Sequence, residues 1–224
     1  MLLPLRDENP TKRIPAVTIF IIALNCLIFL YQALSPQGLD FYTLKMGAIP
    51  YEITHFESLT QVSRLSPLVT LFTSMFLHGS LFHLLGNMLY LWIFGNNVED
   101  FLGSFRFIIF YLLSGLGASF THIIFNPNSQ VPMIGASGAI AGVLGAYFIL
   151  YPGARVSTFV FLFVFIRVIP IPAAYVLGFW FLMQLLNVGL GGGVAWFAHI
   201  GGFLLGIALI KLFSRRKRRR MWVN

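Results

Sequence analysis

Six polar side chains that could carry chemistry lie in or beside strongly apolar segments of the chain. They are His78, His83, Asn87, His122, Ser137 and His199. A polar group inside an apolar span is expensive to bury, so each of them needs an explanation. Nucleophilic attack on a carbonyl requires a hydroxyl, a base that takes its proton, and donors for the developing oxyanion. The set contains all three kinds of group. They could act together if the fold brings them close to one another.

The composition places these residues in a membrane protein. Of the 224 residues, 58% are hydrophobic and 10% are charged, and the mean hydropathy is +0.83. Soluble domains carry about 25% charged residues. Because about 20 apolar residues span a bilayer, we predict six transmembrane helices, at 14–34, 81–98, 104–124, 134–151, 172–188 and 194–212. The predicted fold is an all-α membrane protein, a six-helix bundle with a long external loop between its first two helices.

Two segments outside these spans need separate treatment. The loop 35–66 is long and of mixed polarity, so we expect it to have structure of its own on the outer surface. The segment 156–168 is apolar, but it contains Arg167 and is followed by Pro170 and Pro172. We expect it to be re-entrant or interfacial. A seventh span is the alternative, and it would move the basic tail to the other side of the membrane.

Basic residues predict the orientation. The net charge is +8, and seven of the fifteen Lys and Arg residues fall in the last fourteen positions. A basic run directly after an apolar span is typical of a cytoplasmic anchor on anionic lipid rather than of a nucleic-acid site. Lys12 and Arg13, before the first span, agree with this orientation. We therefore expect a cytoplasmic segment 1–13, a membrane domain 14–213 and a basic cytoplasmic tail 214–224, in a cell membrane.

Helix geometry predicts a similar depth for three of the polar side chains. Ser137 precedes the inner end of its span by fourteen residues, which is about 21 Å. The same arithmetic gives about 18 Å for His199 and about 24 Å for His83. All three are expected in the outer half of the membrane, with the site open toward the external face.

Glycines beside Ser137 and His199 predict where their two helices touch. The small residues are Gly138, Gly142 and Gly145 on one helix and Gly202 and Gly206 on the other. Such stripes let membrane helices approach closely, which would bring the hydroxyl within reach of the imidazole. The alternative for Ser137 taken alone is that it only packs there and bonds back to its own helix.

A dyad of Ser137 and His199 is expected rather than a triad, because no Asp or Glu lies in the outer half of any predicted span. His83 and Asn87 are four residues apart, so they share one helical face and can both donate to an oxyanion. The backbone N–H of Ser137, at the start of its helix, is a third donor. Two alternatives stay open. In one of them, the side chains of His83 and Asn87 serve only to hold neighbouring helices together by hydrogen bonds, and in the other His78 and His83 bind a metal. No metal site is predicted, because no carboxylate or thiolate joins the two histidines.

Three segments resemble the signature motifs of the rhomboid family: HGSLFHLLGN at 78–87, GASG at 135–138 and AHIGG at 198–202. They occur in the family's order and on the corresponding spans. The resemblance implies a six-span rhomboid-like fold and an intramembrane serine protease that needs no cofactor, with Ser137 as nucleophile and His199 as general base.

The resemblance also implies supporting roles and substrates. His83, Asn87 and the Ser137 N–H would form the oxyanion site. Gly135, Gly138 and His78 would support it, and Glu99 would be structural. The substrates would be transmembrane proteins, cleaved within or near their spans. The alternative is a non-catalytic rhomboid-like protein that binds transmembrane helices.

The sequence departs from the family pattern at two places. Val69 and Thr70 stand where members often have Trp-Arg, so the external loop must be anchored differently. Ala141 stands where some members have a Tyr that stacks on the catalytic histidine. His199 would then be oriented by helix packing or by another aromatic residue.

Two further features have a less specific interpretation. Phe179, Trp180, Phe181 and the glycine-rich loop 189–193 are candidates for a mobile gate and cap, or else the aromatic residues form a lipid-facing belt. His122 has no evident partner and is expected at the membrane interface.

Overall fold

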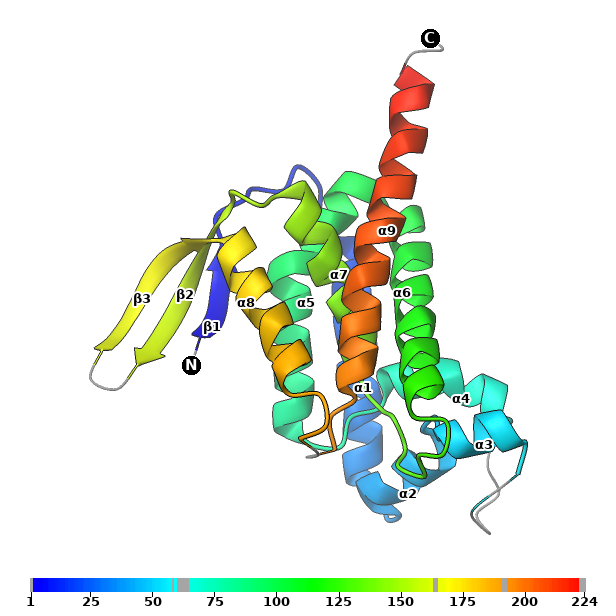
Figure 1. Cartoon of the computed structure of the whole chain (residues 1–224). Helices are drawn as coiled ribbons and strands as arrows, with labels where there is room; N and C mark the ends of the chain where they lie inside the picture. The colour runs from blue at the N-terminus through cyan, green and yellow to red at the C-terminus, as the bar shows by residue number, and fades with distance from the viewer. Residues whose placement is uncertain (1, 58, 60–64, 163–164, 191–192, 222–224) are drawn as a thin grey trace.

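The computed structural model describes residues 2–57, 59, 65–162, 165–190 and 193–221. Helices dominate it, and six of them form a bundle (Figure 1). These are α1 (Ala16–Leu34), α5 (Leu81–Leu102), α6 (Ser104–Phe125), α7 (Ser137–Leu150), α8 (Ala173–Leu186) and α9 (Trp196–Met221). Each overlaps one of the predicted apolar spans with small differences at the ends, except that α9 continues beyond the predicted end at 212 to Met221.

Not every bundle helix is long enough to cross a membrane by itself. Within the described residues, three helices qualify by length and composition: α1, α6 and the part of α9 from Trp196 to Ser214. The count rises to four if α5 is joined to the preceding segment Pro67–Phe76, from which it is bent by 79°. With 14 residues each, α7 and α8 are shorter apolar helices. These helices show that the chain is a membrane protein. That six helices cross the membrane remains a prediction.

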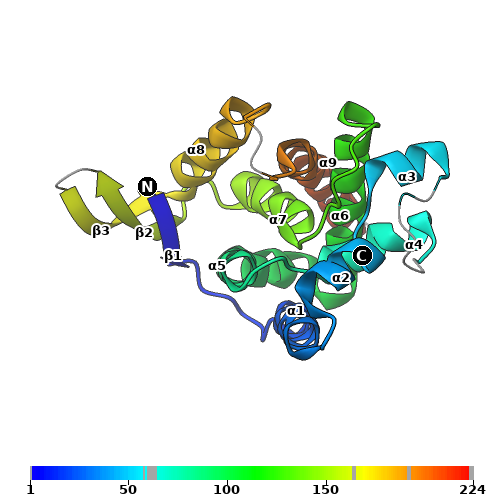
Figure 2. The same cartoon turned by 90° about the horizontal axis from the view of Figure 1, so that it is seen from below.

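Helix α7 lies at the centre of the bundle (Figure 2). Every residue from Ala139 to Tyr147 is buried. A helix that is apolar all round is expected to be buried all round, and α7 has no charged residue to turn toward solvent or lipid headgroups. Ser137, its first residue, is therefore held inside the bundle.

The segment between α1 and α5 contains short helices at the end of the bundle opposite the C-terminus (Figure 1). They are α2 (Gly38–Met46), α3 (Pro50–His55), α4 (Pro67–Thr73) and the 3₁₀ turn η1 (Ser74–Phe76). The Thr73 hydroxyl donates to the Met46 carbonyl at 2.7 Å, tying α4 to α2. Thr70, at one of the two departures from the family pattern, is buried and donates within its own helix to Pro67.

A three-stranded sheet corrects the all-α prediction. Its strands are β1 (Leu2–Asp7), β2 (Arg155–Leu162) and β3 (Phe165–Pro172), antiparallel in the order β1-β2-β3. Residues 156–162 and 165–168 of the predicted re-entrant segment thus lie in two antiparallel strands beside α8. Residues 2–7 of the predicted cytoplasmic segment 1–13 form the strand β1. Val156, Thr158 and Val160 are buried, which is the period of a strand. Phe159 and Phe161, which alternate with these residues, hid the pattern in the sequence because they are apolar as well.

Two carboxylates fix the ends of α1 and β1 to the bundle. Glu99 of α5 accepts hydrogen bonds from the N–H groups of Val17 and Thr18 at 3.0 and 2.8 Å, and from the Thr18 hydroxyl at 2.8 Å. These are donors that the first turn of a helix leaves unpaired, so the expected structural role of Glu99 has a physical basis. Asp7 accepts from the hydroxyl of Tyr147 at 2.8 Å, and burial raises the pKa of its carboxyl.

Candidate active site

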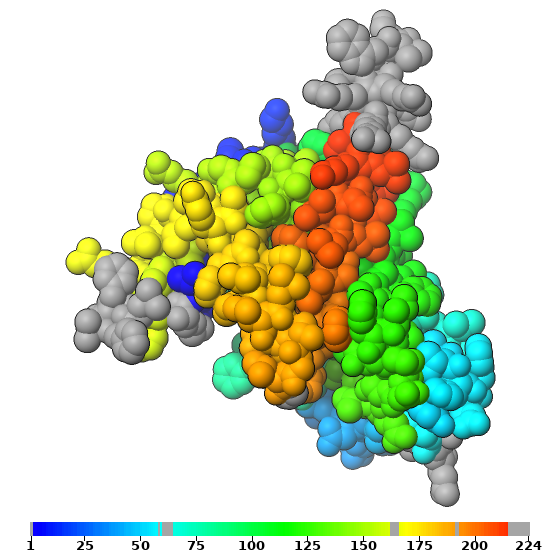
Figure 3. Space-filling model, viewed as in Figure 1, coloured from blue at the N-terminus to red at the C-terminus, as the bar shows by residue number. Residues whose placement is uncertain are grey.

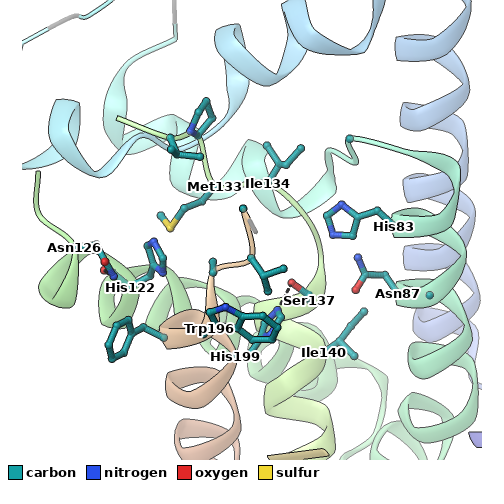
Figure 4. Close-up of a pocket in the computed structure, with 18 of the residues that line it drawn as sticks. His83, Asn87, His122, Asn126, Met133, Ile134, Ser137, Ile140, Trp196 and His199 are labelled. Carbon is teal, nitrogen blue, oxygen red and sulfur yellow. Dashed lines mark hydrogen bonds between the residues drawn. The ribbon is translucent and has the colours of Figure 1, made fainter. Parts of the chain in front are cut away.

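Ser137 and His199 meet inside the bundle. The His199 Nε2 atom lies 2.8 Å from the Ser137 Oγ atom, as the dashed line in Figure 4 marks. Ser137 opens α7, and His199 lies in the first turn of α9. A hydroxyl within hydrogen-bond distance of an imidazole nitrogen is the geometry that proton transfer between them requires.

Close contact between the backbones of α7 and α9 produces this meeting. A methyl group at Gly206 would lie only 2.6 Å from the carbonyl carbon and the Cα of Gly142. One at Gly202 would overlap the carbonyl oxygen of Gly138. The helices are therefore as near to each other as glycine permits. The two predicted glycine stripes face each other, and they set the distance between hydroxyl and imidazole.

Helix α5 contributes the predicted donors His83 and Asn87. The Ser80 side chain caps α5 by accepting from the His83 N–H at 3.1 Å, which fixes the first turn of the helix. Both side chains point from α5 toward Ser137 (Figure 4). Asn87 is 8% exposed, and its Nδ2 atom has no hydrogen-bond partner within the described part of the chain. A buried donor without a partner is costly, unless a bound group uses it.

Gly135 packs directly against these donors. Its φ of +116° lies in the region that favours glycine. A methyl group there would lie 2.7 Å from the His83 Nε2 atom and 3.7 Å from the Asn87 Nδ2 atom. Gly135 thus leaves room for His83 beside the start of α7, and a side chain would push the imidazole away. Gly138 has a different place, in the contact with α9 and α6.

A cavity of about 930 Å³ connects these side chains. Its polar lining includes Ser137, His199, His83, Asn87, His122 and Asn126. The sequence predicted His122 at the membrane interface, whereas in the structure His122 lines the cavity. Trp196 and Trp180 line the same space, so the cavity has both hydrogen-bonding groups and large apolar surfaces. Such a mixture is typical of a ligand site.

The side chains that orient His199 were not identified from the sequence. The His199 Nδ1 atom lies 2.8 Å from the Oε1 atom of Gln184 on α8. The Trp180 ring is tilted against the imidazole at a centroid distance of 5.9 Å, and the Trp196 ring lies edge-on at 6.2 Å. Two aromatic residues therefore lie beside the imidazole, in agreement with the expectation that another aromatic residue stands in for the tyrosine that some members have at the position of Ala141. The sequence feature that could have identified Gln184 is that it is a lone amide in an otherwise apolar helix.

His78 lies behind the site and not in it. It is completely buried, and its ring contacts that of His83 edge-on at 5.0 Å. Its backbone N–H donates to Gln32 of α1 at 3.5 Å. Within the described residues, no three His, Cys, Asp or Glu side chains gather into a set that could hold a metal ion. The contact with His83 is the way in which His78 could support the site.

The residues considered for a gate have different surroundings. Phe181 stacks on Phe203 of α9 at 4.5 Å, whereas Phe179 is 44% exposed. Figure 3 shows α8 on the surface of the bundle, between the hairpin and α9. Gly189 and Gly193, at the ends of the predicted cap, have positive φ angles, and residues 191–192 lie outside the described residues.

Comparison with known proteins identifies relatives along most of the chain. A family model described as "Rhomboid domain" matches residues 65–216. The chain is 30% identical over 168 residues to "Rhomboid protein 1, mitochondrial" of Saccharomyces cerevisiae, covering 68% of this chain and 45% of that protein. It is 34% identical over 146 residues to "RHOMBOID-like protein 6, mitochondrial" of Arabidopsis thaliana, covering 62% and 41%. It is 45% identical over 76 residues to "Rhomboid protease GluP" of Bacillus subtilis, covering 34% and 14%. The chain spans less than half the length of each of these relatives.

Proposed function

The chain belongs to the rhomboid family, and on that basis we propose that it is an intramembrane serine endopeptidase with Ser137 and His199 as its catalytic dyad. The observation that carries the proposal is the 2.8 Å separation between Ser137 Oγ and His199 Nε2. A serine that only packs against a neighbouring helix has no need of an imidazole at this distance. Similarity to a protein named a rhomboid protease in Bacillus subtilis is further support.

In the proposed reaction, Ser137 Oγ attacks the carbonyl carbon of a peptide bond while His199 Nε2 takes its proton. The imidazolium then gives that proton to the leaving amine. Water, activated by the same imidazole, hydrolyses the acyl-enzyme and restores Ser137. His83, Asn87 and the Ser137 N–H would donate to the oxyanion in both steps. The unpartnered Asn87 amide supports this role, and the reaction needs no cofactor.

The substrate would be a transmembrane segment of another protein that unwinds locally. A helical carbonyl is already hydrogen-bonded and covered by its own side chains, so a segment with helix-breaking or small residues is favoured. We also propose six crossings, cytoplasmic termini and an active site near the external face. This orientation places the basic residues 215–220, at the C-terminal end of α9, on the cytoplasmic side. The cell membrane as location stays a prediction, since two of the relatives are named as mitochondrial proteins.

The rival function is a non-catalytic rhomboid-like protein that binds transmembrane helices in the same cavity. Labelling of the purified protein with a fluorophosphonate separates the two, because the reagent reacts with an activated serine and not with a merely buried one. We expect labelling of the wild type and cleavage of a model transmembrane substrate. Ser137→Ala should lose both.

Ser114→Ala is the matched control for this experiment. Ser114 is a buried serine of α6, and its hydroxyl has no partner within the described residues. Its removal should leave labelling and cleavage in place. Labelling that persists unchanged in Ser137→Ala would refute the protease assignment.

Asn87→Ala tests the oxyanion site. We expect kcat for a model substrate to fall by about 10²- to 10³-fold, the cost of removing one oxyanion donor. Because the donor acts on charge that develops in the transition state, KM should change little. Asn126→Ala is the comparison, since Asn126 lines the same cavity and donates to the backbone of His122. An equal loss in both variants would argue against a specific role for Asn87.

A further inference from the structure

Gln184 is a buried amide in the apolar helix α8. Its side chain is 6% exposed, and its Nε2 atom donates to the carbonyl of Trp180 one turn earlier at 2.9 Å. Its Oε1 atom lies 2.8 Å from His199 Nδ1. The amide thus bridges the backbone of α8 and the imidazole that faces Ser137.

The two contacts determine which way the amide points. A carbonyl oxygen such as that of Trp180 only accepts hydrogen bonds, so the atom beside it must be the donor Nε2. The atom that faces His199 is then Oε1, an acceptor. Flipping the amide would set two oxygen atoms against each other at the Trp180 contact.

The orientation of the amide in turn determines the tautomer of His199. An acceptor at Nδ1 requires the proton on Nδ1, which leaves the lone pair on Nε2. That lone pair faces Ser137 Oγ at 2.8 Å. The opposite tautomer would place an N–H against the serine and two lone pairs against each other at Gln184, and it could not remove the hydroxyl proton.

We propose that Gln184 is the positioning residue of the active site, which holds His199 in the tautomer that accepts the Ser137 proton. The inference rests on the proposed function. Gln184 takes the place that a carboxylate occupies in a Ser-His-Asp triad. It touches neither substrate nor reacting atoms, because it contacts the side of the imidazole that faces away from Ser137.

An amide is suited to this place because the surroundings are apolar. Trp180 packs beside His199, Phe203 packs beside Trp180, and Phe181 stacks on Phe203. An ionised carboxylate buried there would be expensive, whereas a neutral amide accepts the same hydrogen bond without a charge. The arrangement also accounts for a dyad without an acidic partner in the outer half of the spans.

Cleavage kinetics test the proposal with Gln184→Leu and Gln184→Glu. In metal sites, loss of the partner that orients a histidine costs about 10- to 100-fold in activity. We expect a similar fall in kcat for Gln184→Leu, with KM for a model transmembrane substrate unchanged. In Gln184→Glu, a protonated carboxyl would keep an acceptor at His199 Nδ1 and its O–H would replace the donor to the Trp180 carbonyl, so this variant should recover most of kcat. Unchanged kcat in Gln184→Leu, or equal losses in Leu and Glu, would overturn the proposal.

Asn25→Leu is the matched control. Asn25 is a buried amide of α1 that donates to the carbonyl of Ile21 one turn earlier at 2.8 Å, as Gln184 does to Trp180. Within the described part of the chain, no hydrogen bond joins it to His199. A loss of kcat in Asn25→Leu as large as that in Gln184→Leu would mean that buried amides only stabilise the fold, and the proposal would fail.

Nitrogen NMR of the wild-type protein gives a test that does not depend on activity. With ¹⁵N-labelled histidine, and His199→Ala to assign the signal, we expect a protonated Nδ1 and an unprotonated Nε2. A protonated Nε2 in the neutral ring would overturn the inference, even if Ser137 is labelled by a fluorophosphonate. An inactive protein with the expected tautomer would instead refute the proposed function and leave the contact with Gln184 standing.

Discussion

Replacement of His199 by alanine is expected to abolish cleavage, lowering kcat by about 10⁴-fold or more. Without the imidazole, no other base in the part of the chain that the structure describes is at hydrogen-bond distance from Ser137 Oγ, because the contact at 2.8 Å comes from His199 Nε2. The variant should remain folded, since the ring packs at the edge of the cavity and its removal leaves one buried acceptor on Gln184 unpaired. That acceptor costs about 1–3 kcal/mol of stability.

Cleavage of a model transmembrane substrate, measured beside a thermal melt in detergent, separates loss of the base from loss of the fold. His122→Ala is the control, because His122 is a histidine of the same cavity and lies on α6. It should retain cleavage far above that of His199→Ala. Full activity in His199→Ala, or equal loss in both variants, would remove His199 from the mechanism.

The pair Ser137 and His199 could be predicted from the sequence because the information is local. The rise of a helix gives the depth of each side chain, and glycines three and seven residues after His199 mark the face that touches α7. The positions of His83 and Asn87 followed in the same way from their spacing of four residues. Each of these inferences needed only one helix and its direction through the membrane.

The contacts that depend on how α8 is rotated could not be predicted. Gln184 contacts His199 only because α8 is rotated so that the face with Gln184 lies toward α9. No repeat of small residues in α8 predicts this contact. The same holds for the walls of the cavity, where His122 of α6 and Trp196 of α9 line the same space. Packing between helices, and not periodicity within one, decides these positions.

The sheet was missed for a different reason. Strand β1 pairs with β2 across about 150 residues of sequence, Leu2 lying opposite Val160, and such long-range pairing leaves no local pattern in either segment. In the apolar run of β2, the face opposite Val156, Thr158 and Val160 is also largely apolar, because it carries Phe159 and Phe161. Length and hydropathy alone do not distinguish such a run from a short membrane helix.

Gly206→Ala is expected to destabilise the protein by about 3 kcal/mol, the upper end of what overpacking costs. The added methyl group would meet the backbone of Gly142, which has no side chain that could move aside. Helices α7 and α9 must then separate, and the hydroxyl of Ser137 moves away from the imidazole of His199. A single methyl group, distant from the reacting atoms, should therefore lower both the melting temperature and the cleavage rate.

Gly178→Ala is the matched control, because Gly178 is also a helical glycine and the nearest atom to its added methyl group, on Phe148, lies at 4.0 Å. There the methyl group fits, and the higher helix propensity of alanine should stabilise α8 by about 0.5–1 kcal/mol. Thermal melts in detergent and fluorophosphonate labelling of the two variants give the comparison. If Gly206→Ala melted and reacted like the wild type, the backbones of α7 and α9 could not be in contact, and the distance between Ser137 and His199 would have to be set by other residues.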